Sequence, residues 1–170
     1  YQGFGDGIEP DAEAVRLFAA ADIPFLVASS FSKSFSLYGE RVGALSIVTA
    51  SHDEALRVQS QLKRVIRTNY SNPPTHGAAI VSAVLNHDEL RVMWETELGE
   101  MRERIRAMRR GLTERLSKVG DFAFIERQRG MFSYSGLSAA QVDRLRTEFG
   151  IYAVSTGRIC VAALNEGNLD

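Results

Sequence analysis

One long amphipathic segment constrains the fold of this chain more than any other feature of its sequence. Between residues 88 and 117, apolar side chains recur every three or four positions, the spacing that places them on one face of an α-helix. At about 1.5 Å per residue, such a helix is roughly 45 Å long. A helix of that length commonly links two lobes, so we expect a domain boundary inside it. The apolar positions are Leu90, Trp94, Leu98, Met101, Ile105, Met108, Leu112 and Leu116.

The sequence before this helix alternates helical patterns with continuous apolar runs, which are typical of strands buried on both faces. Two consecutive prolines, Pro73 and Pro74, forbid a continuing helix and predict a loop. The pattern indicates an α/β arrangement. We expect helices at 11–21, 52–65 and 77–85, buried strands at 23–29 and 42–49, and loops at 30–38 and 69–74.

The sequence after the long helix is typical of an α+β arrangement. Ser138 is placed to cap a helix, with Gln141 completing a weak capping box, and Gly150 is placed to end that helix. We expect this helix at 138–149, two strands at 122–125 and 131–135 around the turn Arg129-Gly130, and a closing strand pair at 151–154 and 159–164.

Composition excludes several classes of protein. Of the 170 residues, 45% are apolar and 24% are charged, which is ordinary globular usage and not that of a disordered chain. The net charge of −1 lacks the basic surplus of a nucleic-acid or anionic-membrane binder. No apolar run approaches the ~20 residues of a transmembrane helix. The single cysteine, Cys160, lies in an apolar run, so we expect a buried, inert thiol and no internal disulfide.

The densest group of chemically capable residues follows the first predicted strand. Lys33 is surrounded by hydroxyls and lies between apolar runs, where loss of water favours the neutral, nucleophilic amine. Ser30, Ser32 and Arg41 are the donors that a phosphate dianion requires. An aldehyde cofactor that carries a phosphate needs both an amine and an anion cradle. An exposed lysine without function remains the alternative interpretation.

Ser30-x-x-Lys33 also matches the Ser-x-x-Lys signature of penicillin-binding acyl enzymes. That interpretation requires partner motifs elsewhere in the chain. No Ser-Asp-Asn occurs, and the Thr156-Gly157 dipeptide follows Ser155 where that family has a lysine. The acyl-enzyme interpretation is therefore disfavoured.

Two further arginines are candidates for binding carboxylates. Arg67 precedes the loop with two prolines, and Arg158 begins an apolar strand. The planar guanidinium holds a carboxylate through two parallel hydrogen bonds. An ordinary surface ion pair is the alternative for each. The three histidines share no metal-ligand spacing, so we expect no metal site.

Together these segments resemble the aspartate and aromatic-amino-acid aminotransferases, which are fold type I enzymes dependent on pyridoxal 5′-phosphate. The resemblance covers nearly the whole chain, in family order. Residues 128–149 and 34–43 are closest to the bacterial aromatic branch, whereas Asn72 is more typical of the aspartate branch, so substrate preference stays open. The matching strings are Tyr1-Gln2-Gly3-Phe4, Ser30 to Lys33 continuing through Leu37 to Gly43, Asn69 to Pro74, Gly130 to Ser133, and Ser155 to Arg158.

The resemblance implies a fold and a set of cofactor contacts. Residues 1–98 would form the C-terminal part of a large, mixed-sheet, cofactor-binding domain, and residues 99–170 would form most of a small α+β domain. Lys33 would hold the cofactor as a Schiff base and move a proton between substrate and cofactor. Tyr1 would hydrogen-bond the phenolic oxygen of the cofactor, while Ser30, Ser32 and Arg41 would bind its phosphate.

The resemblance also implies how substrates bind. Arg158 would clamp the substrate α-carboxylate and Phe132 would line the pocket. Arg67 would reach into the neighbouring subunit of a homodimer with shared active sites, and would pair with the side-chain carboxylate of a dicarboxylic substrate. The reaction would transfer an amino group from an aromatic or dicarboxylic L-amino acid to a 2-oxo acid such as 2-oxoglutarate. A cytoplasmic location is expected.

The chain lacks several parts of the family pattern, among them a phosphate-binding Ser-Gly-Thr loop, a ring-stacking tryptophan, several strands of the sheet and the terminal helices. The acid that pairs with the pyridine nitrogen of the cofactor lies a few residues before the position of Tyr1, so we expect this chain to be the C-terminal portion of a longer protein. Without that acid the cofactor is a poor electron sink, and the isolated chain should not turn over substrate. A catalytically incomplete piece that serves as a structural or interaction module is the alternative function.

Overall fold

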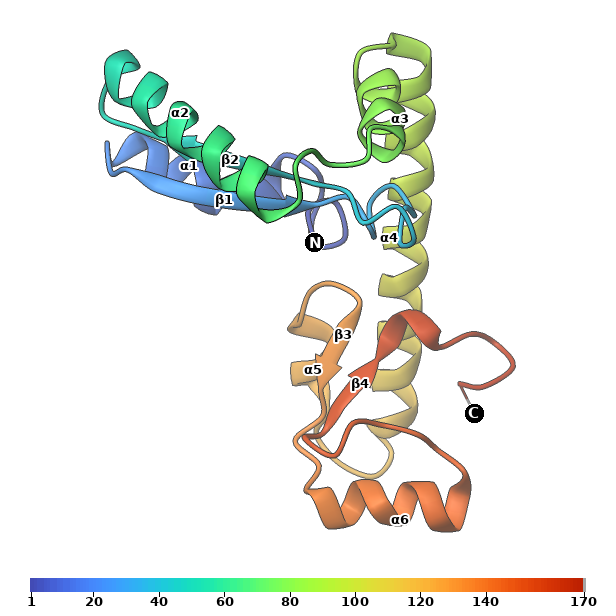
Figure 1. The fold of residues 1–170 in the computed structure, drawn as a ribbon. Coiled ribbons are helices and arrows are strands. Elements are labelled where there is room, and N and C mark those ends of the chain that lie inside the picture. Colours follow the sequence, from blue (N-terminus) through green and yellow to red (C-terminus); the bar gives the residue numbers. More distant parts are fainter. Residues whose placement is uncertain (170) are drawn as a thin grey trace. The chain divides into compact units, whose positions relative to one another are not determined.

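The computed structural model describes residues 1–169, which form two compact units (Figure 1). Unit 1 contains residues 1–3 and 7–97, and unit 2 contains residues 4–6 and those that follow Glu97. The predicted long helix is confirmed as α4 (Asp88–Leu116), a helix of 29 residues in which the chain passes from unit 1 to unit 2. No helix in the described part of the chain is both long and apolar enough to cross a membrane.

Unit 1 contains each of the helices and strands that the sequence predicts for it. Pro10 opens a short 3₁₀ turn, η1 (Pro10–Ala12), which leads into α1 (Glu13–Ala20). Ser51 caps α2 because its side chain accepts a hydrogen bond of 3.2 Å from the Glu54 backbone N–H. The remaining elements are β1 (Phe25–Ser30), β2 (Gly43–Val48), α2 (His52–Asn69), α3 (His76–Leu85) and the first part of α4.

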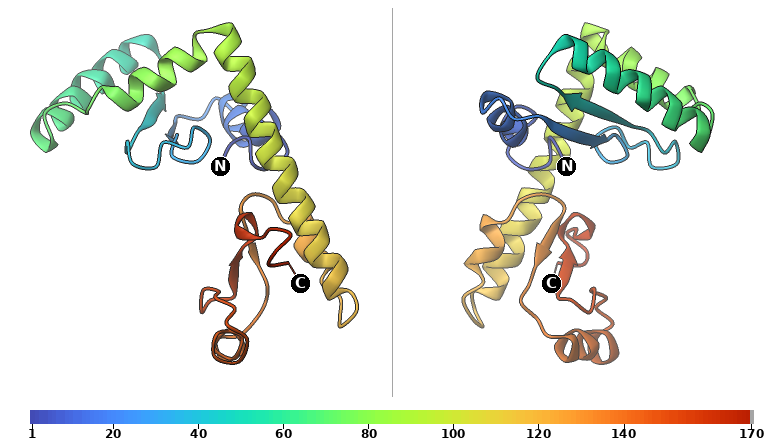
Figure 2. Two further views of the ribbon diagram at one scale, coloured as in Figure 1. Left: turned by 90° about the vertical axis from the view of Figure 1, so that its right-hand side faces the viewer. Right: turned by 60° about the vertical axis from the view of Figure 1, so that its left-hand side comes forward.

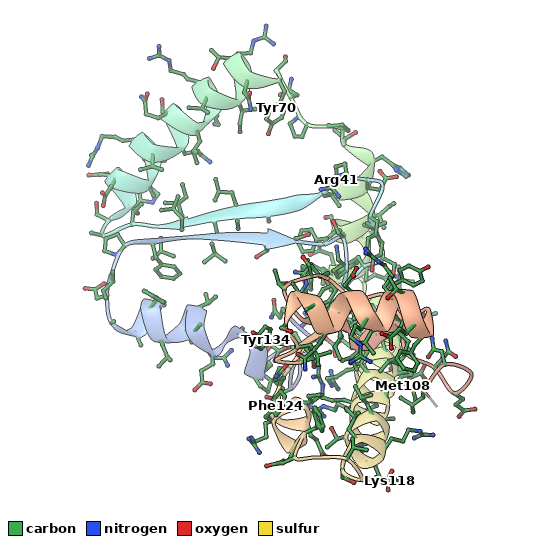
Figure 3. All side chains as sticks on the ribbon, turned by 90° about the horizontal axis from the view of Figure 1, so that it is seen from below. Arg41, Tyr70, Met108, Lys118, Phe124 and Tyr134 are labelled. Atoms are coloured by element: carbon green, nitrogen blue, oxygen red, sulfur yellow. The ribbon has the colours of Figure 1, made fainter. Side chains whose placement is uncertain are left out.

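The two strands of unit 1 form an antiparallel pair in which Phe25 faces Val48 and Ser30 faces Gly43. Helices α1 and α2 lie on opposite faces of this pair (Figures 2 and 3). The prediction that both strands are buried is wrong for this chain, since Leu26 is 69% and Leu45 54% exposed. A strand is buried on both faces and both edges only when other strands and helices surround it. Within the described residues, the sheet of unit 1 has only these two strands.

Unit 2 has its own apolar core, in which Leu98, Ile125 and Val161 are fully buried. These residues come from α4 and from two short elements that follow it. Strands β3 and β4 pair in antiparallel fashion, and α6 lies beyond one end of that pair (Figures 1 and 2). The elements are α5 (Ala123–Arg127), β3 (Phe132–Tyr134), α6 (Ala139–Phe149), β4 (Arg158–Cys160) and the 3₁₀ turn η2 (Val161–Ala163).

Two strand predictions in unit 2 are wrong. Residues 122–125 belong mainly to helix α5, whose first turn is held by a 3.0 Å bond from the Ala123 N–H to the Asp121 carboxylate. Residues 151–154 and 159–164 do not form a strand pair: β4 pairs with β3, and η2 follows directly. The bond from Val154 N–H to Arg158 O, at 3.1 Å, closes the turn before β4 and lies outside the expected pair.

The helix predicted at 138–149 is confirmed with both of its termini. Ser138 and Gln141 form a complete capping box, which is stronger than the sequence suggested, and Gly150 ends α6 with a φ of 66°. The expectation of a buried thiol is wrong, because Cys160 is exposed. In β3 and β4 alternate side chains point to opposite faces, and Cys160 lies on the solvent-facing side while its neighbour Val161 is buried.

Candidate functional site

The first group of candidate residues lies in the loop between β1 and β2, residues 31–42. The Ser30–Gly43 pair ends the ladder, and the Phe31 N–H donates to Val42 O at 3.2 Å, so the two ends of the loop are tied together. A Cβ on Gly43 would lie 2.5 Å from the Ser29 carbonyl oxygen. Only glycine permits this close approach of the strands at the base of the loop.

Lys33 is held within this loop by two aromatic rings. Its Nζ lies 5.1 Å from the centre of the Tyr1 ring and 4.7 Å from that of Tyr38. Contacts of this kind attract an ammonium to the ring face by about 0.5–1 kcal/mol each at exposed sites. Lys33 is half-buried, whereas the other two lysines of the chain, Lys63 and Lys118, are exposed. The structure thus brings Lys33 and Tyr1 together and adds Tyr38.

The predicted phosphate donors belong to the same loop and its base. Ser32 is buried, and its N–H donates to the Ser30 hydroxyl at 3.3 Å. Arg41 is exposed, and its Nη1 donates to the Tyr38 carbonyl at 2.9 Å. Arg41 also has a φ of 52°, a conformation that few residues other than glycine adopt. Two hydroxyls and a guanidinium, all hydrogen-bond donors, therefore lie in the loop that carries the amine.

Aromatic packing holds the loop against α4. The Trp94 indole donates a 2.6 Å hydrogen bond to Ser34 O, and its ring stacks on Phe35 with centroids 4.6 Å apart. Phe31 packs edge-on against Phe35 at 5.4 Å. Stacked and edge-to-face pairs stabilise by about 0.5–1.5 kcal/mol beyond the area they bury. This packing orders the segment on both sides of Lys33.

Arg67 lies apart from the Lys33 loop, in the last turn of α2. It is exposed and donates to the hydroxyl of Ser71, which lies in the loop that connects α2 to α3. Among the described residues, no hydrogen bond or ion pair joins Arg67 to residues 30–43.

The second group of candidates lies in unit 2. Phe132 begins β3 and Arg158 begins β4, and the register places Phe132 opposite Cys160 and Tyr134 opposite Arg158. Residues that face each other across a ladder share one face of it. The Arg158 guanidinium carbon lies 4.9 Å from the centre of the Phe132 ring. The structure thus brings together Arg158, the candidate for binding the substrate α-carboxylate, and Phe132, the candidate for lining the pocket.

The turn before Arg158 positions it on the strand. Gly157 has a φ of 84°, and a Cβ there would lie 2.6 Å from the Leu137 carbonyl oxygen. The Gly157 carbonyl accepts hydrogen bonds from both the N–H and the hydroxyl of Ser135, at 2.9 and 2.7 Å. The sequence Ser155-Thr156-Gly157 therefore builds a turn that only glycine completes, directly before the candidate carboxylate-binding arginine.

Beneath β3 lies an arginine that the sequence prediction missed. Arg109, on α4, is 3% exposed and donates to Ile125 O, Gly130 O and Phe132 O at 3.0, 2.7 and 3.3 Å, and to the Ser133 hydroxyl. Burial lowers the pKa of its guanidinium, and the nearby charge of Arg129 lowers it further. Its position, four residues after Ile105, places it on the apolar face of α4, which is the signal that could have identified it.

A carboxylate holds residues 4–6 within unit 2. Asp6 accepts from Arg129 Nε at 2.8 and 2.9 Å and from Arg106 Nη2 at 2.9 Å. The hydrogen bond from Arg129 is the main reason that the pKa of the Asp6 carboxyl lies below its ordinary value. These residues line a cavity of about 250 Å³ together with Phe4, Arg109 and others.

In the described residues, no group of three or more His, Cys, Asp or Glu side chains is arranged to hold a metal ion.

Comparison with known proteins places this chain in a family. The model of the family "Aminotransferase class I and II" matches residues 1–170. The chain belongs to the class I and II aminotransferase family. The aspartate aminotransferase of Pseudomonas aeruginosa is 73% identical over all of this chain, and the aromatic-amino-acid aminotransferase of Escherichia coli is 55% identical over 99% of it.

A solved aminotransferase structure matches the fold closely. The aromatic-amino-acid aminotransferase of Burkholderia pseudomallei, covalently bound to pyridoxal phosphate, is 76% identical and superposes with a TM-score of 0.97 over all of this chain. The chain thus has the mixed α/β fold of an aminotransferase over its described length. It spans 44% of the Pseudomonas enzyme and 43% each of the Escherichia enzyme and the Burkholderia structure, so it corresponds to less than half of each.

Proposed function

We propose that the protein is a pyridoxal-phosphate-dependent aminotransferase that moves an amino group between an aromatic or dicarboxylic L-amino acid and a 2-oxo acid such as 2-oxoglutarate. The observation that carries this proposal is the placement of Lys33. It is the one half-buried lysine among the described residues, held against Tyr1 and Tyr38 in a loop that also carries hydroxyl and guanidinium donors. Family membership supports the same reaction class.

The donor set around Lys33 fits pyridoxal phosphate. The amine of a lysine suits the aldehyde of the cofactor, and a phenol suits its phenolic oxygen. Two hydroxyls and a guanidinium suit its phosphate dianion. Lys33 would attach the cofactor, Tyr1 would donate to its phenolic oxygen, and Ser30, Ser32 and Arg41 would bind its phosphate. When bound, the cofactor supplies the electron sink that makes the substrate α-proton acidic. Once the amino group of the substrate has displaced it, the Lys33 amine would remove and return that proton as a general base and acid.

The Arg158–Phe132 pair supports a role in substrate binding. The guanidinium offers two parallel donors for the α-carboxylate, a group common to every amino acid and 2-oxo acid. Phe132 lies against its face and provides an apolar wall that suits an aromatic side chain. Arg67 would pair with the second carboxylate of aspartate or 2-oxoglutarate in the site of a second subunit. Its exposed position at the end of α2 is compatible with such a contact.

Several finer features belong to the proposal as well. Unit 1 would be part of the large domain of a fold type I enzyme and unit 2 most of its small domain. The exposed apolar side chains of β1 and β2 would then pack against further strands of that large sheet. A homodimer with shared active sites and a cytoplasmic location follow from the family resemblance alone and remain predictions.

The substrate preference of the protein lies between two branches of the family. A relative named aspartate aminotransferase is 73% identical, and a solved aromatic-amino-acid aminotransferase is 76% identical. These similarities favour an enzyme that accepts both classes of donor. They do not favour the alternative of a non-catalytic structural module.

The test is steady-state kinetics of the full-length protein, supplied with pyridoxal phosphate and 2-oxoglutarate, with aspartate, tyrosine and phenylalanine as donors. We expect turnover of all three, and its loss in Lys33→Ala. Lys63→Ala is the matched control, because Lys63 is an exposed lysine on α2 and should leave the rates unchanged. Absence of turnover with every donor, in protein that takes up the cofactor, would overturn the proposal.

A further inference from the structure

Arg109 is buried with no carboxylate to balance its charge. Its side chain is 3% exposed, and within residues 1–169 every acceptor of its hydrogen bonds is a carbonyl or hydroxyl oxygen. Burying a charged group costs free energy unless it is fully hydrogen-bonded. The cost of burying this charge is therefore offset by the hydrogen bonds that the guanidinium makes, and the arrangement of their acceptors shows what Arg109 holds in place.

The acceptors of Arg109 lie on one short stretch of chain, residues 125–133. Nη1 bonds Ile125 O and the Ser133 hydroxyl, while Nη2 bonds Gly130 O and Phe132 O. The planar fork thus ties the middle of α5, the turn at Gly130 and the first two residues of β3 to a single rigid group. A flexible chain of apolar atoms could fill the same space but could make none of these bonds.

The strand that Arg109 holds carries the proposed substrate residues on its other face. Ser133 is 2% exposed and points towards Arg109, so its neighbours Phe132 and Tyr134 point the opposite way. Arg158 pairs with Tyr134 across the ladder, and its guanidinium lies over the Phe132 ring. The position of the Arg158–Phe132 pair thus depends on the backbone that Arg109 fixes from beneath.

We propose that Arg109 is a positioning residue for substrate carboxylate binding: it fixes the β3 backbone so that Phe132 and Arg158 stand in one geometry before substrate arrives. This inference rests on the role proposed above for Arg158. Its removal should leave Lys33 and the cofactor contacts unchanged, because these belong to unit 1. The effect should fall on the affinity for carboxylates, since the group that binds them is no longer held in place.

The test compares Arg109→Met and Arg109→Lys with the wild type in the full-length protein. The measurements are KM and kcat for aspartate and tyrosine, the dissociation constant of the unreactive carboxylate 3-indolepropionate, and the absorbance of bound cofactor. We expect Arg109→Met to raise KM and the dissociation constant about tenfold or more, with cofactor absorbance retained. Arg109→Lys, which keeps the charge and some donors, should lie between Met and wild type.

Two control variants separate positioning from general weakening. Arg110→Met changes the next residue of α4, which is exposed, and should leave all the constants unchanged. Val142→Ala opens a cavity at α6, which makes no hydrogen bond to Arg109 in the described residues, and should lower the unfolding temperature without raising KM. An equal rise of KM in Val142→Ala and Arg109→Met, at matched loss of stability, would overturn the positioning role.

The outcomes also distinguish this inference from the proposed function. One outcome is that the wild type transaminates and binds 3-indolepropionate, while both Arg109 variants keep the KM and dissociation constants of the wild type. Arg109 then contributes to folding alone, and the positioning role is overturned. If Arg109→Met does not fold, unchanged constants in a folded Arg109→Lys variant contradict the inference in the same way. Absence of turnover in the wild type itself counts against the proposed function and not against the contacts of Arg109.

Discussion

The turn before Arg158 depends on a glycine, and its replacement gives a prediction that can be worked out from the structure. Gly157 and Gly150 both have positive φ angles, 84° and 66°. Alanine at either position would carry the strain of a left-handed conformation, about 1 kcal/mol. A Cβ on Gly150 would meet no atom within 4 Å, so Gly150→Ala should lose only this amount.

Gly157→Ala should cost considerably more. Its Cβ would lie 2.6 Å from Leu137 O, a distance at which the backbone must move. Such a movement stretches the two hydrogen bonds that the Gly157 carbonyl accepts from Ser135, each with a net contribution of about 1 kcal/mol. The total is about 3 kcal/mol, roughly three times the loss in Gly150→Ala.

Urea unfolding of the two full-length variants measures this difference, and steady-state kinetics measures its consequence. Because Arg158 follows Gly157 directly, KM for amino-acid substrates should rise in Gly157→Ala and stay unchanged in Gly150→Ala. Equal losses of stability in the two variants, with the same KM, would refute the link between this turn and the placement of Arg158.

Three further predictions follow from single residues. Arg67→Leu should reduce kcat/KM for aspartate far more than for phenylalanine, and equal losses would remove its proposed contact with a side-chain carboxylate. The pKa of the Asp6 carboxyl is lowered in the folded protein, so its contribution to stability is present at neutral pH and is lost as the pH falls below the ordinary value of 3.8. The difference in unfolding free energy between wild type and Asp6→Asn should therefore shrink on acidification. A difference that stays constant with pH would contradict this. Ser138→Ala removes the cap of α6 and should cost about 1 kcal/mol in urea unfolding, whereas Ser60→Ala, at an exposed position inside α2, removes no cap and should cost less.

Helices and motif residues were predictable from the sequence because their signals are local. Regular apolar spacing located α4, and Ser138 and Gly150 mark the ends of α6 with hydrogen bonds that lie within a few residues. The grouping of Lys33 with hydroxyls and Arg41 was visible for the same reason, since all lie in one loop between two strands.

Features that depend on contacts distant in sequence were not predictable. Residues 122–125 are apolar enough for a strand, but the Asp121 side chain starts a helical turn there. The partner of β4 proved to be β3, about 25 residues earlier, because Ser135 bonds to Gly157 and sets the register. The position of Arg109 on the apolar face of α4 indicates burial, but nothing near it in sequence shows that residues 125–133 supply its acceptors.

The central claim is that Lys33 carries the cofactor, and chemical trapping tests it most directly. Borohydride reduction of the full-length protein with pyridoxal phosphate fixes the cofactor to its lysine, and peptide mass spectrometry locates the attachment. The described chain offers three lysines, Lys33, Lys63 and Lys118. The account predicts the reduced cofactor on Lys33 and its loss in Lys33→Ala; stoichiometric attachment at another lysine, or none at all, would contradict it.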